Sequence, residues 1–95
     1  SYASPQRLAG EPACYADDLF ALGIVVYFVL TGAHPFAGLP ADRAARLGMR
    51  PAPPPGLSSP QWRALRRCLA FDARARPGSV HEVAQALAGA PPGAV

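Results

Sequence analysis

Residues 19–30 form an almost unbroken run of apolar side chains, and this run constrains the fold more than any other feature of the chain. The run is longer than a usual strand and shorter than the roughly 20 residues that span a bilayer. Asp17 and Asp18 precede it, where carboxylates suit the positive end of a helix dipole. Gly32 follows it, where glycine suits the left-handed position that ends a helix. The run therefore predicts a helix of about four turns that does not cross a membrane.

This predicted helix has no polar face. Its apolar side chains occupy successive positions, so they point in every direction around a period of about 3.6 residues. Such a helix has to be covered on all sides, and we expect it at the centre of the fold. We also expect further sequence upstream of Ser1, because the short helices that follow are too small to cover it.

The rest of the chain predicts a small all-α domain with many breaks. Ninety-five residues allow one domain at most, and twelve prolines and nine glycines divide them into short elements. Further helices are expected in residues 41–47, 58–70 and 79–88. The last two begin with the spacing of a capping box, with Ser58 before Gln61 and Ser79 before Glu82. Residues 51–56, rich in proline, are expected to be an extended connection.

The last two predicted helices are amphipathic. Each carries an apolar stripe at helical spacing, which indicates packing on one face and favours a core position for the single tryptophan. The stripes are formed by Trp62, Leu65 and Leu69, and by Val80, Val83 and Leu87.

The charged residues and cysteines argue against several classes of site. Arg63, Arg66 and Arg67 fall on one predicted helix, and with a net charge of +3 a solvated helix face is a simpler interpretation than a nucleic-acid surface. Cys14 and Cys68 lack CxxC spacing and neighbouring histidines, so neither a zinc site nor a redox motif is indicated. We expect two reduced cysteines in a cytoplasmic protein.

No catalytic motif is present in the sequence. It has no glycine-rich phosphate loop, no HExxH and no GxSxG, and its carboxylates are scattered. His34 and His81 each stand alone, so we expect them to be exposed and without a catalytic role.

Three motifs, in the same order along the chain, resemble the C-terminal part of the large lobe of eukaryotic-type Ser/Thr protein kinases, with bacterial kinases the most similar. Residues 2–6 (YASPQ) resemble the Ala-Pro-Glu end of the activation segment, with serine and glutamine at its first and last positions. Residues 18–36, with DLFALG, TG and PF, resemble the central helix and the loop after it. Residues 72–77 (DARARP) resemble Asp-Pro-x-x-Arg-Pro, with alanine at the first proline.

This resemblance implies a partial kinase lobe. Residues 1–89 are expected to form about four helices around the apolar central helix, and residues 90–95 a flexible tail. The expected partners are protein substrates and the missing upstream kinase portion, with no nucleic acid. No catalytic, cofactor-binding or metal-binding residue is expected in this chain. ATP and magnesium are expected for the intact parent, whose catalytic lysine and aspartates would lie upstream.

The resemblance also implies roles on the substrate and nucleotide sides. Tyr2 and Ala3 match the end of the loop that receives the substrate residue after the phosphorylated hydroxyl. Val25 and Val29 match positions that anchor a stack of apolar residues beneath the adenine ring, a role that is physically the same as core packing.

Two further roles are structural. Asp18 matches an aspartate that accepts hydrogen bonds from the backbone of the catalytic loop, although a favourable charge at the helix start, which Asp17 also supplies, is a simpler role. Gln6 replaces a glutamate that forms a buried salt bridge with the arginine matching Arg76.

Three functions therefore remain open on the sequence alone. The first is part of an active Ser/Thr kinase. The second is a pseudokinase that binds partners without catalysis, which is favoured mildly by Gln6 in place of glutamate and by Ala73 in place of proline. The third, a helical nucleic-acid-binding module, rests only on the arginine cluster.

Overall fold

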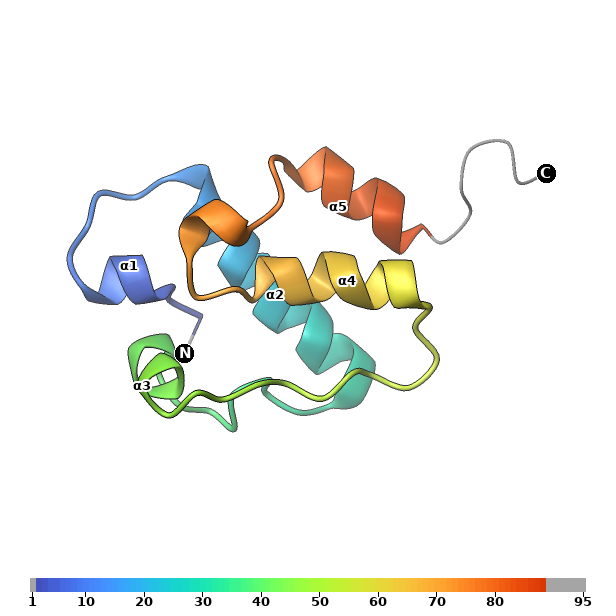
Figure 1. Ribbon diagram of the computed structural model, residues 1–95, viewed down its shortest axis with the longest axis horizontal. Coiled ribbons are helices and arrows are strands. Elements are labelled where there is room, and N and C mark those ends of the chain that lie inside the picture. The colour runs from blue at the N-terminus through green and yellow to red at the C-terminus, as the bar shows by residue number, and fades with distance from the viewer. Residues whose placement is uncertain (1, 89–95) are drawn as a thin grey trace.

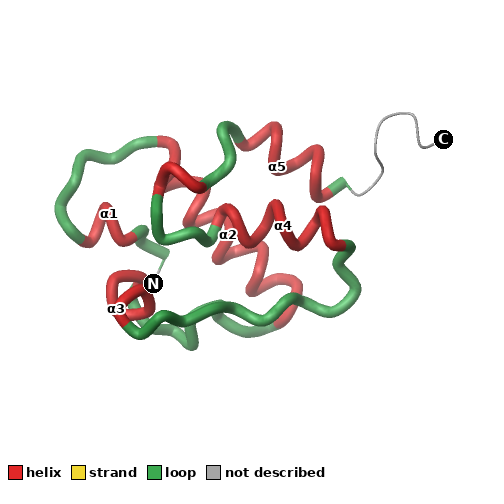
Figure 2. The backbone as a smooth tube through the Cα atoms, in the orientation of Figure 1, coloured by secondary structure: helices red, strands yellow, loops and turns green. Residues whose placement is uncertain are grey.

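The computed structural model describes residues 2–88, and helices and loops account for all of that range (Figures 1 and 2). The elements are α1 (Pro5–Leu8), α2 (Tyr15–Thr31), α3 (Ala41–Arg46), α4 (Ser59–Cys68), the 3₁₀ turn η1 (Ala73–Ala75) and α5 (Val80–Leu87). The predicted all-α class is confirmed. The predicted tail in 90–95 and the domain boundary at 89 lie outside the described residues.

The central helix α2 begins and ends at capped positions. The carboxylate of Asp17 accepts a hydrogen bond from the backbone N–H of Cys14 at 2.8 Å, so α2 starts at Tyr15, two residues before the predicted start. At the other end Gly32 adopts φ 73°, and its N–H donates to the Phe28 carbonyl at 2.7 Å. The predicted glycine end of the helix is confirmed.

The starts of α4 and α5 differ in their capping. In α4 the Ser58 hydroxyl accepts from the Gln61 N–H at 3.2 Å, and the Gln61 side chain accepts from the Ser58 N–H at 2.9 Å. In α5 Ser79 accepts from the Glu82 N–H at 3.1 Å, whereas the Glu82 carboxylate accepts from Gly78 at 2.8 Å. The predicted capping box is therefore complete in α4, while in α5 the glutamate binds the N–H one residue before the cap.

The core lies where α2, α3 and α4 meet, and α4 crosses α2 in Figure 1. The crossing is close at Gly23, where a Cβ atom would lie 2.9 Å from the Cβ of Cys68. A smaller cluster of Leu19, Cys68 and Val83 joins α2, α4 and α5. The main cluster consists of Phe20, Ile24, Tyr27, Phe36, Ala41, Ala44, Leu65 and Leu69.

The extended connection between α3 and α4 is fixed to this core. Tyr27 donates its hydroxyl hydrogen to the Ala52 carbonyl at 2.7 Å, and Pro54 is buried. The tilted ring of Tyr27 in turn lies 6.4 Å from the ring of Trp62, which is half-buried. The prediction of a proline-rich connection is confirmed, and Trp62 packs against the core as expected.

Helix α2 is not covered on all sides by the described residues. Val25, Phe28, Val29 and Leu30 are exposed, with Val29 reaching 75%. The apolar side chains of α2 project from every side of the helix, but α4, α5 and the α3 region cover only one of those sides. No helix in residues 2–88 is both long and apolar enough to span a membrane.

Two smaller expectations were wrong. Val80 is 55% exposed, because it occupies the first helical position of α5, whereas Val83 one turn later is buried. His34 is half-buried, because its Nδ1 accepts a hydrogen bond from the Phe36 N–H at 3.0 Å and its ring meets the Phe36 ring edge-on. His81 is exposed as expected.

Candidate functional site

Arg76 is the centre of a buried polar site that joins the two ends of the sequence. Its side chain follows η1, only 4% of the residue is exposed, and its guanidinium carbon lies 4.9 Å from the centroid of the Phe20 ring. All of its hydrogen bonds go to neutral oxygens. These bonds are Nε to Ala70 O at 2.9 Å, Nη1 to Ala16 O at 3.0 Å, and Nη2 to Gln6 Oε1 at 2.8 Å and to Phe71 O at 3.3 Å.

Gln6 uses both ends of its amide in this site. The oxygen accepts from Arg76, and the nitrogen donates to the Phe71 carbonyl at 2.8 Å. The amide thereby fixes α1 to the segment that follows α4.

Among residues 2–88, no carboxylate forms an ion pair with the Arg76 guanidinium. Asp72, the nearest acidic residue in sequence, instead accepts from Arg74 at 3.3 Å and caps η1. Burial lowers the pKa of Arg76, but an arginine side chain stays protonated at any pH near neutrality. The site therefore holds a buried cation that is solvated by dipoles.

A second buried contact ties the same N-terminal segment to α2. The fully buried Ser4 hydroxyl donates to Asp17 Oδ1 at 2.5 Å and accepts from the Arg7 N–H at 3.1 Å, which caps α1. Asp17 is 8% exposed. Burial acts to raise the pKa of Asp17, but the hydrogen bonds from Ser4 and Cys14 outweigh burial and hold the pKa below its ordinary value.

The Ser4–Asp17 contact was missed by the sequence analysis. A local signal was available for Ser4, because a hydroxyl residue followed by Pro5 is a helix-start pattern like that of residues 58–60. The sequence pattern indicates Asp17 only as a charge at the start of a helix. Its partner lies 13 residues away, beyond the reach of helical periodicity.

The other candidate residues lie apart from this site. Tyr2 is 56% exposed and Ala3 half-buried, and they lead into α1, which lies beside α3 (Figure 1). Asp18 is exposed and makes no side-chain hydrogen bond or ion pair within residues 2–88.

Asp18, Val25 and Val29 share one side of α2. Their spacing of seven and eleven residues returns to nearly the same direction around a helix. The valines are 45% and 75% exposed, and this side faces away from the buried Phe20 and Ile24. The structure thus separates the candidate residues into a buried group around Arg76 and an exposed group along α2.

Comparison with known proteins identifies relatives that are similar to this chain in sequence. The chain is 36% identical to serine/threonine-protein kinase pkn2 of Myxococcus xanthus, over 94% of the chain and 12% of the relative. It is 32% identical to PkaA of Streptomyces coelicolor, over 83% of the chain and 15% of the relative. It is 35% identical to PknD of Chlamydia pneumoniae, over 86% of the chain and 9% of the relative. Both are serine/threonine-protein kinases. No family profile matches the chain.

The chain is a Ser/Thr protein kinase-related region. It spans between 9% and 15% of the length of these three relatives. The family resemblance noted in the sequence is confirmed, and the all-helical fold is consistent with part of a kinase large lobe.

In this kinase-related region the first and last family motifs meet in space. Residues 2–6 and 72–77 are far apart in sequence, and the hydrogen bond between Gln6 and Arg76 joins them. The resemblance implied this pair, and the structure contains the contact, with an amide in place of the family's carboxylate.

Proposed function

We propose that this region forms the C-terminal part of the large lobe of a Ser/Thr protein kinase and holds the end of the activation segment against the base of that lobe. The Gln6–Arg76 contact is the observation that supports this proposal best. It couples the segment bearing Tyr2 and Ala3 to the helical core, and Ser4 adds a second attachment through Asp17. Two attachments in so short a segment, one buried and one partly buried, give it a defined position relative to α2.

The proposal assigns two surfaces to this region. Tyr2 and Ala3 receive the substrate residue after the phosphorylated hydroxyl. Asp18, Val25 and Val29 face the catalytic portion, where Asp18 accepts backbone hydrogen bonds from the catalytic loop and the valines support the apolar stack beneath adenine. Their common exposed side on α2 supports this assignment, because an aspartate and two valines there are available to a further part of the protein.

ATP and magnesium are assigned to residues outside this chain. Within residues 2–88 no group of three or more His, Cys, Asp or Glu side chains is placed to hold a metal ion. The side chains described here therefore do not fit a magnesium site, and no step of phosphoryl transfer is derived through them. Their part in catalysis is to position the substrate and the catalytic loop, and the rate of phosphoryl transfer depends strongly on such positioning.

A pseudokinase scaffold is the second candidate. Gln6 replaces the charged partner of Arg76, and Ala73 replaces a proline, so two family features are weakened in this chain. Both changes lie around the attachment of the activation segment, which a scaffold without phosphoryl transfer would not need to hold as firmly.

Transfer of labelled phosphate from ATP with magnesium to a protein hydroxyl, measured on the protein at its native length, tests the proposal. We expect Asp18→Asn to lower this rate about tenfold to a hundredfold, because a misplaced catalytic loop costs rates of that order. The matched control is Asp42→Asn, an exposed carboxylate on α3 that lies 3.9 Å from Arg46 and accepts a local hydrogen bond from the Arg43 N–H, and it should leave the rate unchanged. A folded protein that binds its partners but transfers no phosphate would favour the pseudokinase instead.

A further inference from the structure

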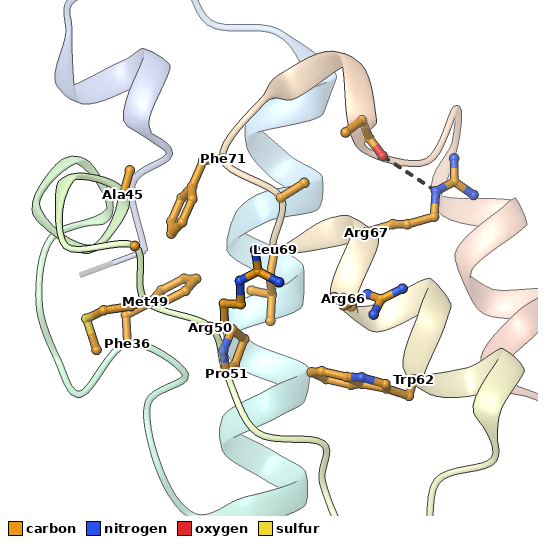
Figure 3. A pocket seen from close by; sticks show the side chains of 13 residues that line it. Phe36, Ala45, Met49, Arg50, Pro51, Trp62, Arg66, Arg67, Leu69 and Phe71 are labelled. Atoms are coloured by element: carbon orange, nitrogen blue, oxygen red, sulfur yellow. Dashed lines mark hydrogen bonds between the residues drawn. The ribbon is translucent and has the colours of Figure 1, made fainter.

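An open pocket of about 630 Å³ lies between the connection after α3, helix α4 and the segment around η1. Figure 3 shows the side chains that line it. The pocket borders the Gln6–Arg76 site, because Ala70 and Phe71 line it while their backbone carbonyls accept hydrogen bonds from Arg76. Neither Gln6 nor Arg76 lines the pocket, and no lining residue lies on the exposed side of α2. Its volume is within the size range of sites that hold a small ligand or several side chains.

The floor and walls of this pocket are apolar and firmly packed. Phe36 and Phe71 lie with ring centroids 5.2 Å apart, and Trp62 lies against Tyr27. Met49 completes the wall from the α3–α4 connection and packs against the core. Because these side chains are already held in place, an apolar group entering the pocket would not have to order them first.

The polar lining of the pocket carries a single sign of charge. Arg50, Arg66 and Arg67 all line it, and no acidic side chain does (Figure 3). Arg67 is partly engaged, since Nε donates to the Ala75 carbonyl at 3.5 Å and Nη1 lies 4.0 Å from Glu82. Arg50 and Arg66 are exposed and form no ion pair within the described residues. Two cations beside an apolar cavity are thus left available to an anionic partner.

We propose that this pocket docks an acidic peptide segment of a partner protein. The segment inserts one bulky apolar side chain between Met49, Trp62 and Phe71, and its carboxylates pair with Arg50 and Arg66. This inference does not rest on the proposed kinase activity, because it uses only the shape and charge of the pocket.

The pocket favours a peptide over a nucleic acid. Of the three exposed arginines on α4, Arg63 does not line the pocket and Arg67 is partly engaged, so only Arg66 from this helix is left beside the cavity as a free cation. An apolar cavity flanked by two separate cations matches a side chain with neighbouring carboxylates. Extended phosphate backbones are instead bound by denser rows of cations.

Fluorescence anisotropy on the protein at its native length tests this proposal. The probe is a fluorescein-labelled peptide in which phenylalanine is flanked on both sides by glutamates. We expect the double variant Arg50→Glu/Arg66→Glu to weaken binding about tenfold or more, since each charge pair at a rim is worth a few-fold and reversal adds repulsion. Binding should also weaken as salt is raised. Peptides with serine for phenylalanine, or lysine for glutamate, should bind at least tenfold more weakly.

Arg63→Glu is the matched control, because Arg63 lies on the same helix, is exposed, and is not among the residues that line the pocket. Its variant should bind the peptide as the unaltered protein does. The proposal is overturned if the acidic peptide does not bind at millimolar concentration, or if Arg63→Glu weakens binding as much as the double variant. It is equally overturned if a labelled single-stranded oligonucleotide binds tighter than the peptide and loses affinity on the Arg50→Glu/Arg66→Glu change. Thermal melting of each variant identifies any loss of folding, and the serine and lysine peptides test the pocket without altering the protein.

Discussion

Arg76 donates a hydrogen bond from Nη2 to the side-chain oxygen of Gln6 at 2.8 Å, across 70 residues of sequence. The guanidinium is buried, and every acceptor around it is neutral. A buried cation is costly unless it is paired or well hydrogen-bonded. Here three backbone carbonyls and one side-chain amide accept its hydrogen bonds. The amide contributes in a second way, because its nitrogen donates to the Phe71 carbonyl at 2.8 Å.

Restoring a carboxylate at position 6 should stabilise the protein. In Gln6→Glu an ion pair with Arg76 replaces a hydrogen bond from the same charged donor to a neutral amide, so Coulombic attraction between two opposite charges is added. The loss of the bond to Phe71 offsets part of that gain, since a carboxylate cannot donate. We therefore expect a small rise in melting temperature, equivalent to about 1 kcal/mol or less, measured by calorimetry.

Two further variants check the cause of that rise. Gln6→Ala removes both hydrogen bonds and should cost about 1 to 3 kcal/mol of unfolding free energy. Arg76→Lys keeps the charge but loses the planar fork, and it should be more damaging in the Gln6→Glu background than in the unaltered protein. Additive effects of positions 6 and 76, or a melting temperature lowered by Gln6→Glu, would contradict this account of the pair.

The second attachment of the N-terminal segment predicts a dependence of stability on pH. The folded state holds the pKa of Asp17 below its ordinary value, so it stabilises the ionised form. That contribution is fully present above the ordinary pKa of about 3.9 and is lost as pH falls through the lower pKa of the folded protein. Asp17→Asn should lose about 1 to 3 kcal/mol at neutral pH, because an amide offers one neutral acceptor oxygen where the carboxylate offers Ser4 and Cys14 two charged ones.

Denaturant unfolding of the two proteins between pH 7 and about pH 3 measures this difference. The difference in unfolding free energy should be constant near neutral pH and should shrink below about pH 4, because the carboxylate becomes protonated in the unfolded chain before it does so in the folded protein. Asp42→Asn is the control, and because its carboxylate is exposed it should cost less than about 0.5 kcal/mol. A difference that stays the same down to pH 3 would mean that the charge of Asp17 does not matter.

The helices that the sequence predicted well are those with local signals at their ends. Gly32 ends α2, and Ser58 with Gln61 starts α4, because the residues that make each cap are neighbours in sequence. Helix α1 was missed because four residues are too few for a periodic pattern. The start of α2 was placed late because its N-cap is Cys14, which is not one of the usual capping residues.

The candidate site was less accessible to sequence reasoning. Ser4 and Asp17 meet only because the loop between them folds back, and no periodicity links residues so placed. Gln6 and Arg76 were paired by family resemblance rather than by any pattern in the chain. The exposure of Val25 and Val29 was not predicted either, since a run that is apolar on all sides does not say which side its neighbours cover.

The two cysteines should differ sharply in reactivity. Cys68 is fully buried, and burial raises its pKa to about 11, whereas Cys14 is exposed at the start of α2. At pH 8 only about one in a thousand Cys68 side chains would be thiolate, which is the reactive form. Iodoacetamide should therefore label Cys14 first and Cys68 only after unfolding, as followed by peptide mass spectrometry.

The control is Cys14→Ser, which retains a capping side chain and should leave this region unlabelled under native conditions. Equal labelling of both cysteines without denaturant would mean that the contact of Cys68 with Leu19 and Val83 opens readily.

Gly23 tests how closely α2 and α4 approach each other. Replacing glycine by alanine inside a helix usually stabilises it by about 1 kcal/mol. Here the added Cβ would lie 2.9 Å from the Cβ of Cys68 and 3.1 Å from the Cδ2 of Leu69. A Cβ atom has no torsional freedom with which to avoid such a contact, so the helices would have to move apart. Overpacking of this kind typically costs about 1 to 3 kcal/mol.

We therefore expect Gly23→Ala to lower the unfolding free energy by about 1 to 2 kcal/mol net, the opposite of the change that helix propensity alone predicts. The comparison is Ala21→Gly in the same helix, two positions away, which should also destabilise, by about 1 kcal/mol, because it adds chain entropy without relieving any contact. Calorimetric melting of both variants decides the matter. If Gly23→Ala melted at a higher temperature than the unaltered protein, propensity would outweigh contact, and α2 and α4 would lie farther apart than their crossing at Gly23 and Cys68 implies.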